Sequence, residues 1–214
     1  TIANICQRVP NADVETVAKA IGLDPRIGPL YLKAGPGYGG SCFHKDLQAL
    51  ISFSRSRNYE PILLTAVEEA NQRQATEIVN LSKRLLGSLD NRRIAVLGLA
   101  FKKDTDDMRE AASLRVIDEL LKNGARVSAY DPMALENARR ILGDKVELMP
   151  NAISCLKGAD CCIVMTEWDE FRKLKPSDYK LSMNAPNIVD ARRITKRDDF
   201  DGFNYLAVGL GTSS

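Results

Sequence analysis

The stretch Ile94-Ala-Val-Leu-Gly98 is a short apolar run that ends in glycine, and it decides the fold class of this 214-residue chain. Runs of this kind are typical of strands buried in a parallel sheet. An amphipathic helix over 113–123, closed by Gly124, follows it, and then comes a second apolar run, Arg126-Val-Ser-Ala-Tyr130. The order of strand, helix and strand predicts a parallel sheet covered by helices on both faces.

The alternation continues to the end of the chain. Helices are expected at 133–141 and 152–156, and further strands at 145–148, 160–166, 187–190 and 205–208. Residues 89–214 are therefore predicted to form a Rossmann-like α/β domain. The usual dinucleotide fingerprint needs three spaced glycines after the first strand, and only Gly98 is present there. A dinucleotide site of that kind is not expected in this domain.

Residues 1–88 have a helical pattern and are predicted to form a separate domain. Helices are expected at 12–21, with Asn11 as N-cap, and at 45–57. Nothing interrupts the helical periodicity over 61–86, which gives a helix roughly 40 Å long. A helix of this length connects domains or lies along a subunit interface, and we expect both here. The predicted fold is an α/β protein in which this helix joins a helical domain to the sheet domain.

The composition excludes several classes of protein. Hydrophobic residues make up 44% and charged residues 27%, as in packed globular domains. The net charge of +2, without a long basic run, argues against nucleic acid and membrane surfaces as partners. The cysteines are odd in number and irregularly spaced, which predicts reduced thiols in a cytoplasmic protein and no metal site. They are Cys6, Cys42, Cys155, Cys161 and Cys162, and the adjacent last two are expected in the core.

The stretch Gly35-Pro-Gly-Tyr-Gly-Gly-Ser-Cys-Phe-His-Lys-Asp46 carries the most reactive chemistry of the chain. Glycines let the backbone approach a ligand closely, and a helix that begins near Cys42 would favour its thiolate. Cys42 is therefore predicted to be a nucleophile, although most free cysteines are buried and inert. Asp46 lies one helical turn further on. Two interpretations are open for its carboxylate: it orients water, or it is a plain surface charge. His44 is not expected to pair with Cys42, because residues two apart on a helix point in different directions.

Charged residues follow two of the predicted strands, at the edge where open α/β sheets bind ligands. Lys102 lies in the charged stretch 101–109. Two interpretations are open for it: it holds a phosphate at a helix N-terminus, or it belongs to a solvated charged loop. Asp131 ends the second strand and is interpreted equally as a ribose contact or as a turn residue. Arg192 or Arg193 either reaches the same crevice or lies on the surface.

Six motifs in one order resemble the UDP-glucose/GDP-mannose dehydrogenase family, and the resemblance covers essentially the whole chain. They are Val14-Glu-Thr-Val-Ala-Lys-Ala-Ile-Gly-Leu-Asp-Pro-Arg-Ile-Gly28, Gly37-Tyr-Gly-Gly-Ser-Cys-Phe-His-Lys-Asp46, Gly98-Leu-Ala-Phe-Lys-Lys-Asp-Thr-Asp-Asp-Met-Arg-Glu110, Tyr130-Asp-Pro132, Thr166-Glu-Trp168 and Asp190-Ala-Arg192. The resemblance implies a helical central domain, residues 1–88, and a domain that binds a nucleotide sugar, residues 89–214.

The resemblance also implies site residues. Cys42 is the implied nucleophile, and Asp46 assists water activation and proton transfer. The sugar nucleotide is lined by Tyr31, Leu32, Lys33, Ala34, Gly35, Gly39, Phe101, Lys102 and Arg192. Lys45 and Arg109 reach NAD, and Arg26 crosses from a neighbouring subunit to the substrate. His44 departs from the family pattern, in which proline or glutamine is expected.

The implied reaction oxidises the C6 alcohol of UDP-glucose to UDP-glucuronate in two NAD-dependent steps, through a thiohemiacetal and a thioester on Cys42. The family pattern places an NAD-binding domain, with a catalytic lysine and asparagine, upstream of Thr1. The chain is therefore expected to be a fragment that is inactive alone and forms a homodimer through its central domain. GDP-mannose or another nucleotide sugar as substrate remains an alternative. So does a non-catalytic module that binds nucleotide sugars or dimerises.

Overall fold

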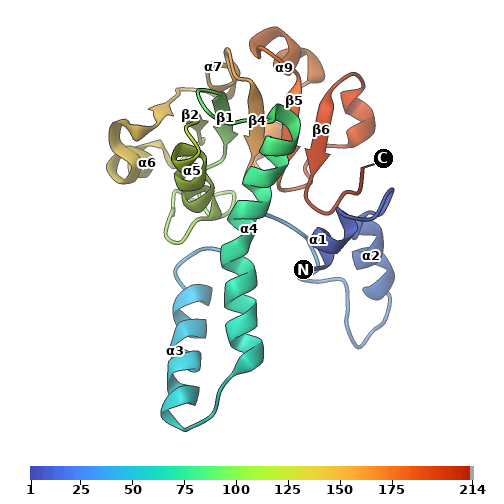
Figure 1. The fold of residues 1–214 in the computed structure, drawn as a ribbon, viewed down its shortest axis with the longest axis vertical. Helices are drawn as coiled ribbons and strands as arrows, with labels where there is room; N and C mark the ends of the chain where they lie inside the picture. The colour runs from blue at the N-terminus through green and yellow to red at the C-terminus, as the bar shows by residue number, and fades with distance from the viewer. Residues whose placement is uncertain (213–214) are drawn as a thin grey trace.

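A single parallel sheet forms the centre of the molecule. The computed structural model describes residues 1–212, and Figure 1 shows the sheet with helices on both sides and a helical hairpin that projects away from it. The strand order is β3-β2-β1-β4-β5-β6, and every pairing is parallel. The strands are β1 (Arg93–Leu97), β2 (Arg126–Tyr130), β3 (Glu147–Leu148), β4 (Cys161–Val164), β5 (Asn187–Asp190) and β6 (Asn204–Ala207). The predicted α/β fold is confirmed, and the strand order reverses between β1 and β4, where such sheets bind ligands.

Helices cover both faces of the sheet. The helices of residues 1–212, including α3 in the projecting hairpin, are α1 (Ile2–Cys6), α2 (Val14–Ile21), α3 (Phe43–Ser56), α4 (Ile62–Leu86), α5 (Ala112–Lys122), α6 (Leu135–Leu142), α7 (Ala152–Leu156), α8 (Asp169–Arg172) and α9 (Pro176–Ser182), with short 3₁₀ turns at Gly143–Lys145 and Arg197–Phe200. Alternate strand residues face opposite layers. Ile94 packs with α4 and α5, whereas Ala95 packs with α7 and α9. Cys161 and Cys162 divide in the same way and are fully buried, as predicted.

Helix α4 belongs to two structural surroundings. Its C-terminal half is buried against the sheet through residues that include Ile78 and Leu81. Its N-terminal half leaves the sheet and pairs with α3 to form the projecting hairpin. The predicted long helix is thus confirmed. The apolar residues at its start are not buried within the chain, however, because Ile62 and Leu63 are 75% and 74% exposed.

The N-terminal helices are attached to the far edge of the sheet, beside β6 (Figure 1). The backbone of Val14 donates to Gly209 over 2.8 Å, and that of Gly211 donates to the oxygen of Ala12 over 2.8 Å. The prediction that Asn11 caps α2 was wrong, because the N-cap is Asp13, whose carboxylate accepts from the backbone of Glu15. The helix starts later than predicted, since residues 12 and 13 are held against the C-terminal segment by backbone pairing.

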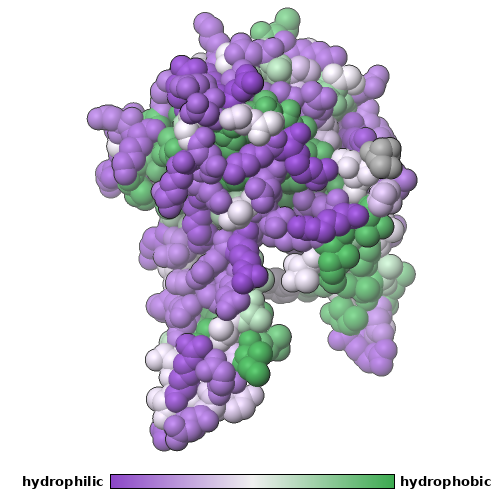
Figure 2. Space-filling view, in the orientation of Figure 1, coloured by the Kyte–Doolittle hydropathy of each residue, from purple (hydrophilic) through white to green (hydrophobic). Residues whose placement is uncertain are grey.

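Helices α8 and α9 are additions to the predicted elements. Lys175 and Asp178 form a reciprocal cap at the start of α9, and Pro176 occupies its first turn. Figure 2 shows a mostly hydrophilic surface with apolar side chains gathered over the α1–α2 region. Exposed large residues in that region include Ile5 and Leu23. Over residues 1–212, none of the helices combines the length and apolar character needed to cross a membrane.

Candidate active site

The glycine loop before α3 lies directly against the loop that follows β1. The backbone of Gly40 donates to the oxygen of Arg109 over 2.9 Å. A Cβ on Gly39 would overlap the carbonyl of Glu110, and one on Gly40 would lie 2.9 Å from the ring of Phe101. Only glycine permits this approach, so the loop composition follows from packing between the two parts of the chain.

Cys42 sits at the N-cap of α3 and is exposed. Its Sγ lies 3.7 Å from Oγ of the neighbouring Ser41. Arg109 is near enough to be affected by this thiol. The hydrogen bond and charge of Asp107 raise the pKa of Arg109, and the charge of Cys42 adds to that effect. The free amides of the first turn of α3 and the guanidinium of Arg109 are both groups that interact favourably with a sulfur anion.

Lys45 and Asp46 lie on the first turn of α3 and pair with each other. Their charged atoms are 3.3 Å apart, and the two side chains are 74% and 67% exposed. The backbone of Asp46 donates to the oxygen of Cys42 over 2.9 Å, which places Asp46 one turn beyond the cysteine, as predicted. Both side chains are free to turn toward a ligand, because a surface ion pair of this kind contributes little stability.

Arg192 joins three segments of the site. Its Nε donates to the oxygen of Met165 over 3.0 Å, and its terminal nitrogen donates to the oxygen of Phe101 over 3.2 Å. A Cβ on Gly35 would lie 3.0 Å from the same guanidinium. Burial lowers the pKa of Arg192, and Glu167, 3.2 Å away, opposes that effect. Beside this arginine, the Nζ of Lys102 lies 5.3 Å from the centre of the Phe101 ring.

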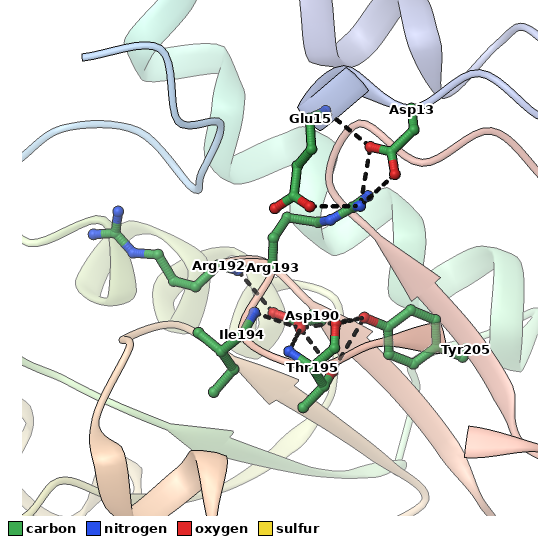
Figure 3. Close-up of polar contacts among 8 residues, drawn as sticks. All are labelled: Asp13, Glu15, Asp190, Arg192, Arg193, Ile194, Thr195 and Tyr205. Carbon is green, nitrogen blue, oxygen red and sulfur yellow. Dashed lines mark hydrogen bonds and ion pairs between the residues drawn. The ribbon is translucent and has the colours of Figure 1, made fainter. Parts of the chain in front are cut away.

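Arg193 has different partners from Arg192, although both line the cavity described below. Figure 3 shows Arg192 and Arg193 leaving the same turn in different directions. Arg193 donates to both carboxylate oxygens of Asp13, at 2.9 and 2.7 Å, and lies 3.4 Å from Glu15. Of the two arginines considered from the sequence, Arg192 faces the 101–110 loop, and Arg193 ties the sheet to α2.

Two buried carboxylates hold the turns at the carboxyl edge of the sheet. Asp131 accepts hydrogen bonds from backbone amides on both sides of it and from the indole of Trp168. Asp190 accepts from the backbones of residues 192, 194 and 195 and from the hydroxyl of Tyr205 (Figure 3). Each is fully buried and fully engaged. The turn interpretation of Asp131 therefore fits the structure better than a ribose contact.

A cavity of about 500 Å³ opens beside Arg192. Its lining contains several residues predicted for the sugar nucleotide, and additional charged ones from α2 and α8: Leu32, Lys33, Ala34 and Arg192, with Glu15, Lys19 and Arg172. Tyr31 is 96% exposed and does not line it. Arg26 does not line it either; within residues 1–212 it forms an ion pair with Asp24, at 2.6 Å, and its side chain is 87% exposed.

The sequence interpretation missed a polar cluster behind the cysteine loop. Glu68 of α4 is only 5% exposed and contacts both His44 and Tyr38. Asn71, one turn further along, binds the backbone of Tyr38 through both ends of its amide. The available signal was the set of polar residues at three-residue spacing in α4, Glu68, Asn71 and Gln74.

The parallel sheet, its charged carboxyl edge and the exposed cysteine at a helix N-terminus define an α/β protein that carries charged groups and an exposed thiol at one edge of its sheet. Comparison with known families is specific. The UDP binding domain of the UDP-glucose/GDP-mannose dehydrogenase family matches residues 95–197, and the central domain of the same family matches residues 1–73. The chain belongs to the UDP-glucose/GDP-mannose dehydrogenase family.

Individual relatives agree with this assignment. The chain is 41% identical to the UDP-glucose 6-dehydrogenase TuaD of Bacillus subtilis (strain 168), over 98% of this chain and 45% of the relative. It is 43% identical to the UDP-glucose 6-dehydrogenase AglM of Haloferax volcanii, over 94% and 46% of the two chains. A solved UDP-glucose dehydrogenase from Pyrobaculum islandicum superposes with a TM-score of 0.87 at 36% identity, covering 98% of this chain and 47% of that one. The chain thus spans about half the length of the relatives it matches.

Proposed function

We propose that this chain is the catalytic-cysteine and UDP-sugar-binding part of an NAD-dependent UDP-glucose 6-dehydrogenase. The observation that carries the proposal is the position of Cys42, exposed at the N-terminus of α3 and packed through Gly39 and Gly40 against the loop after β1. Family membership supports the substrate class, because the matched second domain is described as UDP binding. The free state of every cysteine fits a reducing, cytoplasmic setting.

The thiol gives the reaction its covalent step. The sulfur of Cys42 attacks the C6 aldehyde, and the carbonyl oxygen takes up a proton to give a thiohemiacetal. Loss of hydride from C6 and of the hydroxyl proton then leaves a thioester. Water adds to the thioester carbon, the sulfur leaves as thiolate, and the sugar carboxylate is released. Asp46, one turn from Cys42 and exposed, is the group that orients this water and accepts its proton.

The nucleotide part of the substrate is assigned to the carboxyl edge of the sheet. Arg192 and Lys102 present two cationic groups beside the Phe101 ring, which suits a diphosphate next to an aromatic contact. Lys33 lines the cavity beside Arg192. Together with Leu32, Ala34, Gly35 and Gly39, these residues form the proposed sugar-nucleotide site. Tyr31, which is exposed, is assigned to the same site, and Arg26, also exposed, is assigned to a contact with substrate across a homodimer formed through the central domain.

NAD, when bound, accepts the hydride in each of the two oxidation steps. The loop after β1 has Gly98 but no further glycine of a dinucleotide cradle, so this chain offers edge contacts only. Lys45 and Arg109 suit that role, because both are exposed cations next to Cys42 and each is held only by a local carboxylate. The chain alone is therefore proposed not to turn over, since the dinucleotide cradle must come from elsewhere.

Selective alkylation tests the role of Cys42. With limiting iodoacetamide at neutral pH, mass spectrometry should find Cys42 modified far faster than the other thiols. The other four are buried, and burial raises the pKa of Cys155 and Cys161 to about 12. Labelling of Cys42 as slow as that of a free model thiol would count against a catalytic nucleophile.

The reaction itself requires a longer protein, in which an NAD-binding domain precedes this chain. That protein should reduce NAD with UDP-glucose, and Cys42→Ser should abolish UDP-glucuronate formation. Comparing UDP-glucose with UDP-galactose and GDP-mannose would determine the sugar and the base. Turnover preserved in Cys42→Ser, or by this chain without an NAD-binding domain, would overturn the proposal.

A further inference from the structure

The carboxylate of Glu68 is the polar centre of the α3–α4 hairpin. It lies in the middle of α4 and is 5% exposed. One oxygen accepts from the amide of Gln72, at 3.0 Å, and lies 2.9 Å from Nδ1 of His44. The other accepts from the hydroxyl of Tyr38 at 3.0 Å. A buried carboxylate is costly to desolvate, and this one has no part in the proposed reaction.

The protonation states around Glu68 follow from these contacts. Burial raises the pKa of Glu68, but the hydrogen bonds from Gln72 and Tyr38 and the adjacent His44 outweigh that effect, so the pKa is lowered below 4.5. Burial and Glu68 together raise the pKa of Tyr38 to about 12. At neutral pH the carboxylate is therefore ionised and the phenol is its donor. An ionised carboxylate only accepts, so Nδ1 of His44 carries the hydrogen in that bond.

Two of the side chains that contact Glu68, Tyr38 and His44, lie on either side of Cys42 in the sequence. Tyr38 precedes Cys42 by four residues, and His44 follows it by two. The rings of Tyr38 and Phe43 are in edge contact, with centroids 5.9 Å apart, which joins the two flanks to each other. Within residues 1–212 the Cys42 side chain has a weak hydrogen bond with Ser41 and the charge interaction with Arg109, so its position depends largely on what holds its neighbours.

We propose that Glu68 is the positioning residue for Cys42, and that it acts by fixing Tyr38 on one side of the cysteine and His44 on the other. The inference rests on the proposed role of Cys42 as nucleophile. It gives His44, the residue that departs from the family pattern, a role as a brace rather than as a base. The brace holds the thiol at the N-terminus of α3 and near Arg109.

Other charged groups around the brace belong to separate contacts. Arg115 of α5 donates to the backbone oxygen of Tyr38, at 3.2 Å, and pairs with Glu110. Lys45 and Asp46 pair with each other on the turn that carries His44. Arg109 is paired with Asp107 on the facing loop. Within residues 1–212, His44 is thus the cationic or potentially cationic group in an ion pair with Glu68.

Alkylation of Cys42 in variants of this chain tests the brace. His44→Ala removes the hydrogen bond between His44 and Glu68. The rate constant for alkylation of Cys42 at neutral pH should then fall by about fivefold or more, the scale of a lost hydrogen bond to a charged group. His44→Gln restores an amide donor and should recover the rate to within about twofold of wild type. Glu68→Ala should slow the reaction at least as much as His44→Ala. Tyr38→Phe removes only the hydroxyl that donates to Glu68 and keeps the ring, so it should slow the reaction less.

Glu60→Gln is the matched control. It breaks the pair with Arg55 at the far tip of the same hairpin, where the atoms are 2.9 Å apart, and should leave the rate unchanged.

The outcomes separate the two proposals. Slow wild-type alkylation of Cys42 would overturn its role as nucleophile. Fast wild-type alkylation that His44→Ala and Tyr38→Phe leave unchanged or accelerate would overturn the brace and leave the nucleophile standing. An equal loss of rate in Glu60→Gln would also overturn the brace, because the effect would then reflect general loosening of the hairpin.

Discussion

Replacing Arg193 should weaken the attachment of α2 to the end of the sheet. The side chain is 10% exposed and makes two hydrogen bonds to Asp13, at 2.9 and 2.7 Å. Burial alone would lower its pKa, but the hydrogen bond to Asp13 and the charges of Asp13 and Glu15 raise it. Removing one partner of a fully buried pair costs about 3–5 kcal/mol. Asp13 is 29% exposed, so water replaces part of the interaction, and we expect about 2 kcal/mol for Arg193→Gln.

A double-mutant cycle isolates this interaction from the packing of the arginine stem. Asp13→Asn removes the charge but keeps an oxygen that caps α2, because asparagine is as good an N-cap as aspartate. Urea unfolding of wild type, both single variants and the double variant should give a coupling of about 1–2 kcal/mol. With a slope of about 2 kcal/mol per molar urea, Arg193→Gln should lower the midpoint by about 1 M. Additive single-variant effects, within about 0.3 kcal/mol, would refute the reasoning.

Gly98→Ala should lower the free energy of unfolding by about 3 kcal/mol or more, because the new Cβ would overlap Thr166 at a backbone φ of +100°. Gly87→Ala, at φ +74° in open space, should cost only about 1 kcal/mol, and the reverse order in chemical unfolding would contradict the packing argument. Glu68→Gln should be less stable than wild type at neutral pH, and the difference should shrink as the pH falls below the ordinary glutamate value of 4.5. The sign follows because a carboxyl with a lowered folded pKa stabilises the fold only while ionised, and a difference that stays constant into acid would be inconsistent with it. Spectrophotometric titration of Tyr38→Phe should lack one phenol that ionises at about pH 12, and an unchanged titration curve there would show that Tyr38 is not held by Glu68.

The sheet was predictable because most of its strands are short apolar runs that are buried on both faces. Ile94 and Ala95 face different layers for the same reason that Cys161 and Cys162 do, and neither inference needs tertiary information. The long helix over 62–86 was predictable because no proline or glycine interrupts it. The division of this helix into a half buried against the sheet and a half that projects from it was not predictable, since the helical period is the same in both halves.

Short elements and buried polar groups were not predictable in the same way. Helix α8 has four residues, too few to show a helical period. The N-cap of α2 is at Asp13 because residues 12 and 13 pair through their backbone with the C-terminal segment, which is far away in the sequence. Glu68 carries a charge on a helix, which from sequence indicates an exposed face, and only the approach of the cysteine loop buries it.

The proximity of the candidate site residues followed from topology. The loops that carry Phe101 and Arg192 follow β1 and β5, and parallel strands bring their carboxyl ends to one edge. The glycine loop joins them because its glycines permit contact with residues 101 and 110. Arg26 does not line the cavity beside Arg192, and its proposed contact depends on a second copy of the chain, whose position a single sequence does not encode.

The continuity of α4 has a mechanical consequence. The C-terminal half of the helix is fixed in the core against the sheet. The N-terminal half is therefore a stiff arm about 18 Å long, against which α3 packs. If this arm tilted by about 10° about the point where α4 leaves the sheet, its tip would move by roughly 3 Å, while residues close to that point would hardly move. Cys42 lies at the inner end of α3, where Gly40 is bonded to the loop after β1. The hairpin tip is therefore free to adapt to whatever it meets while the sulfur keeps its place.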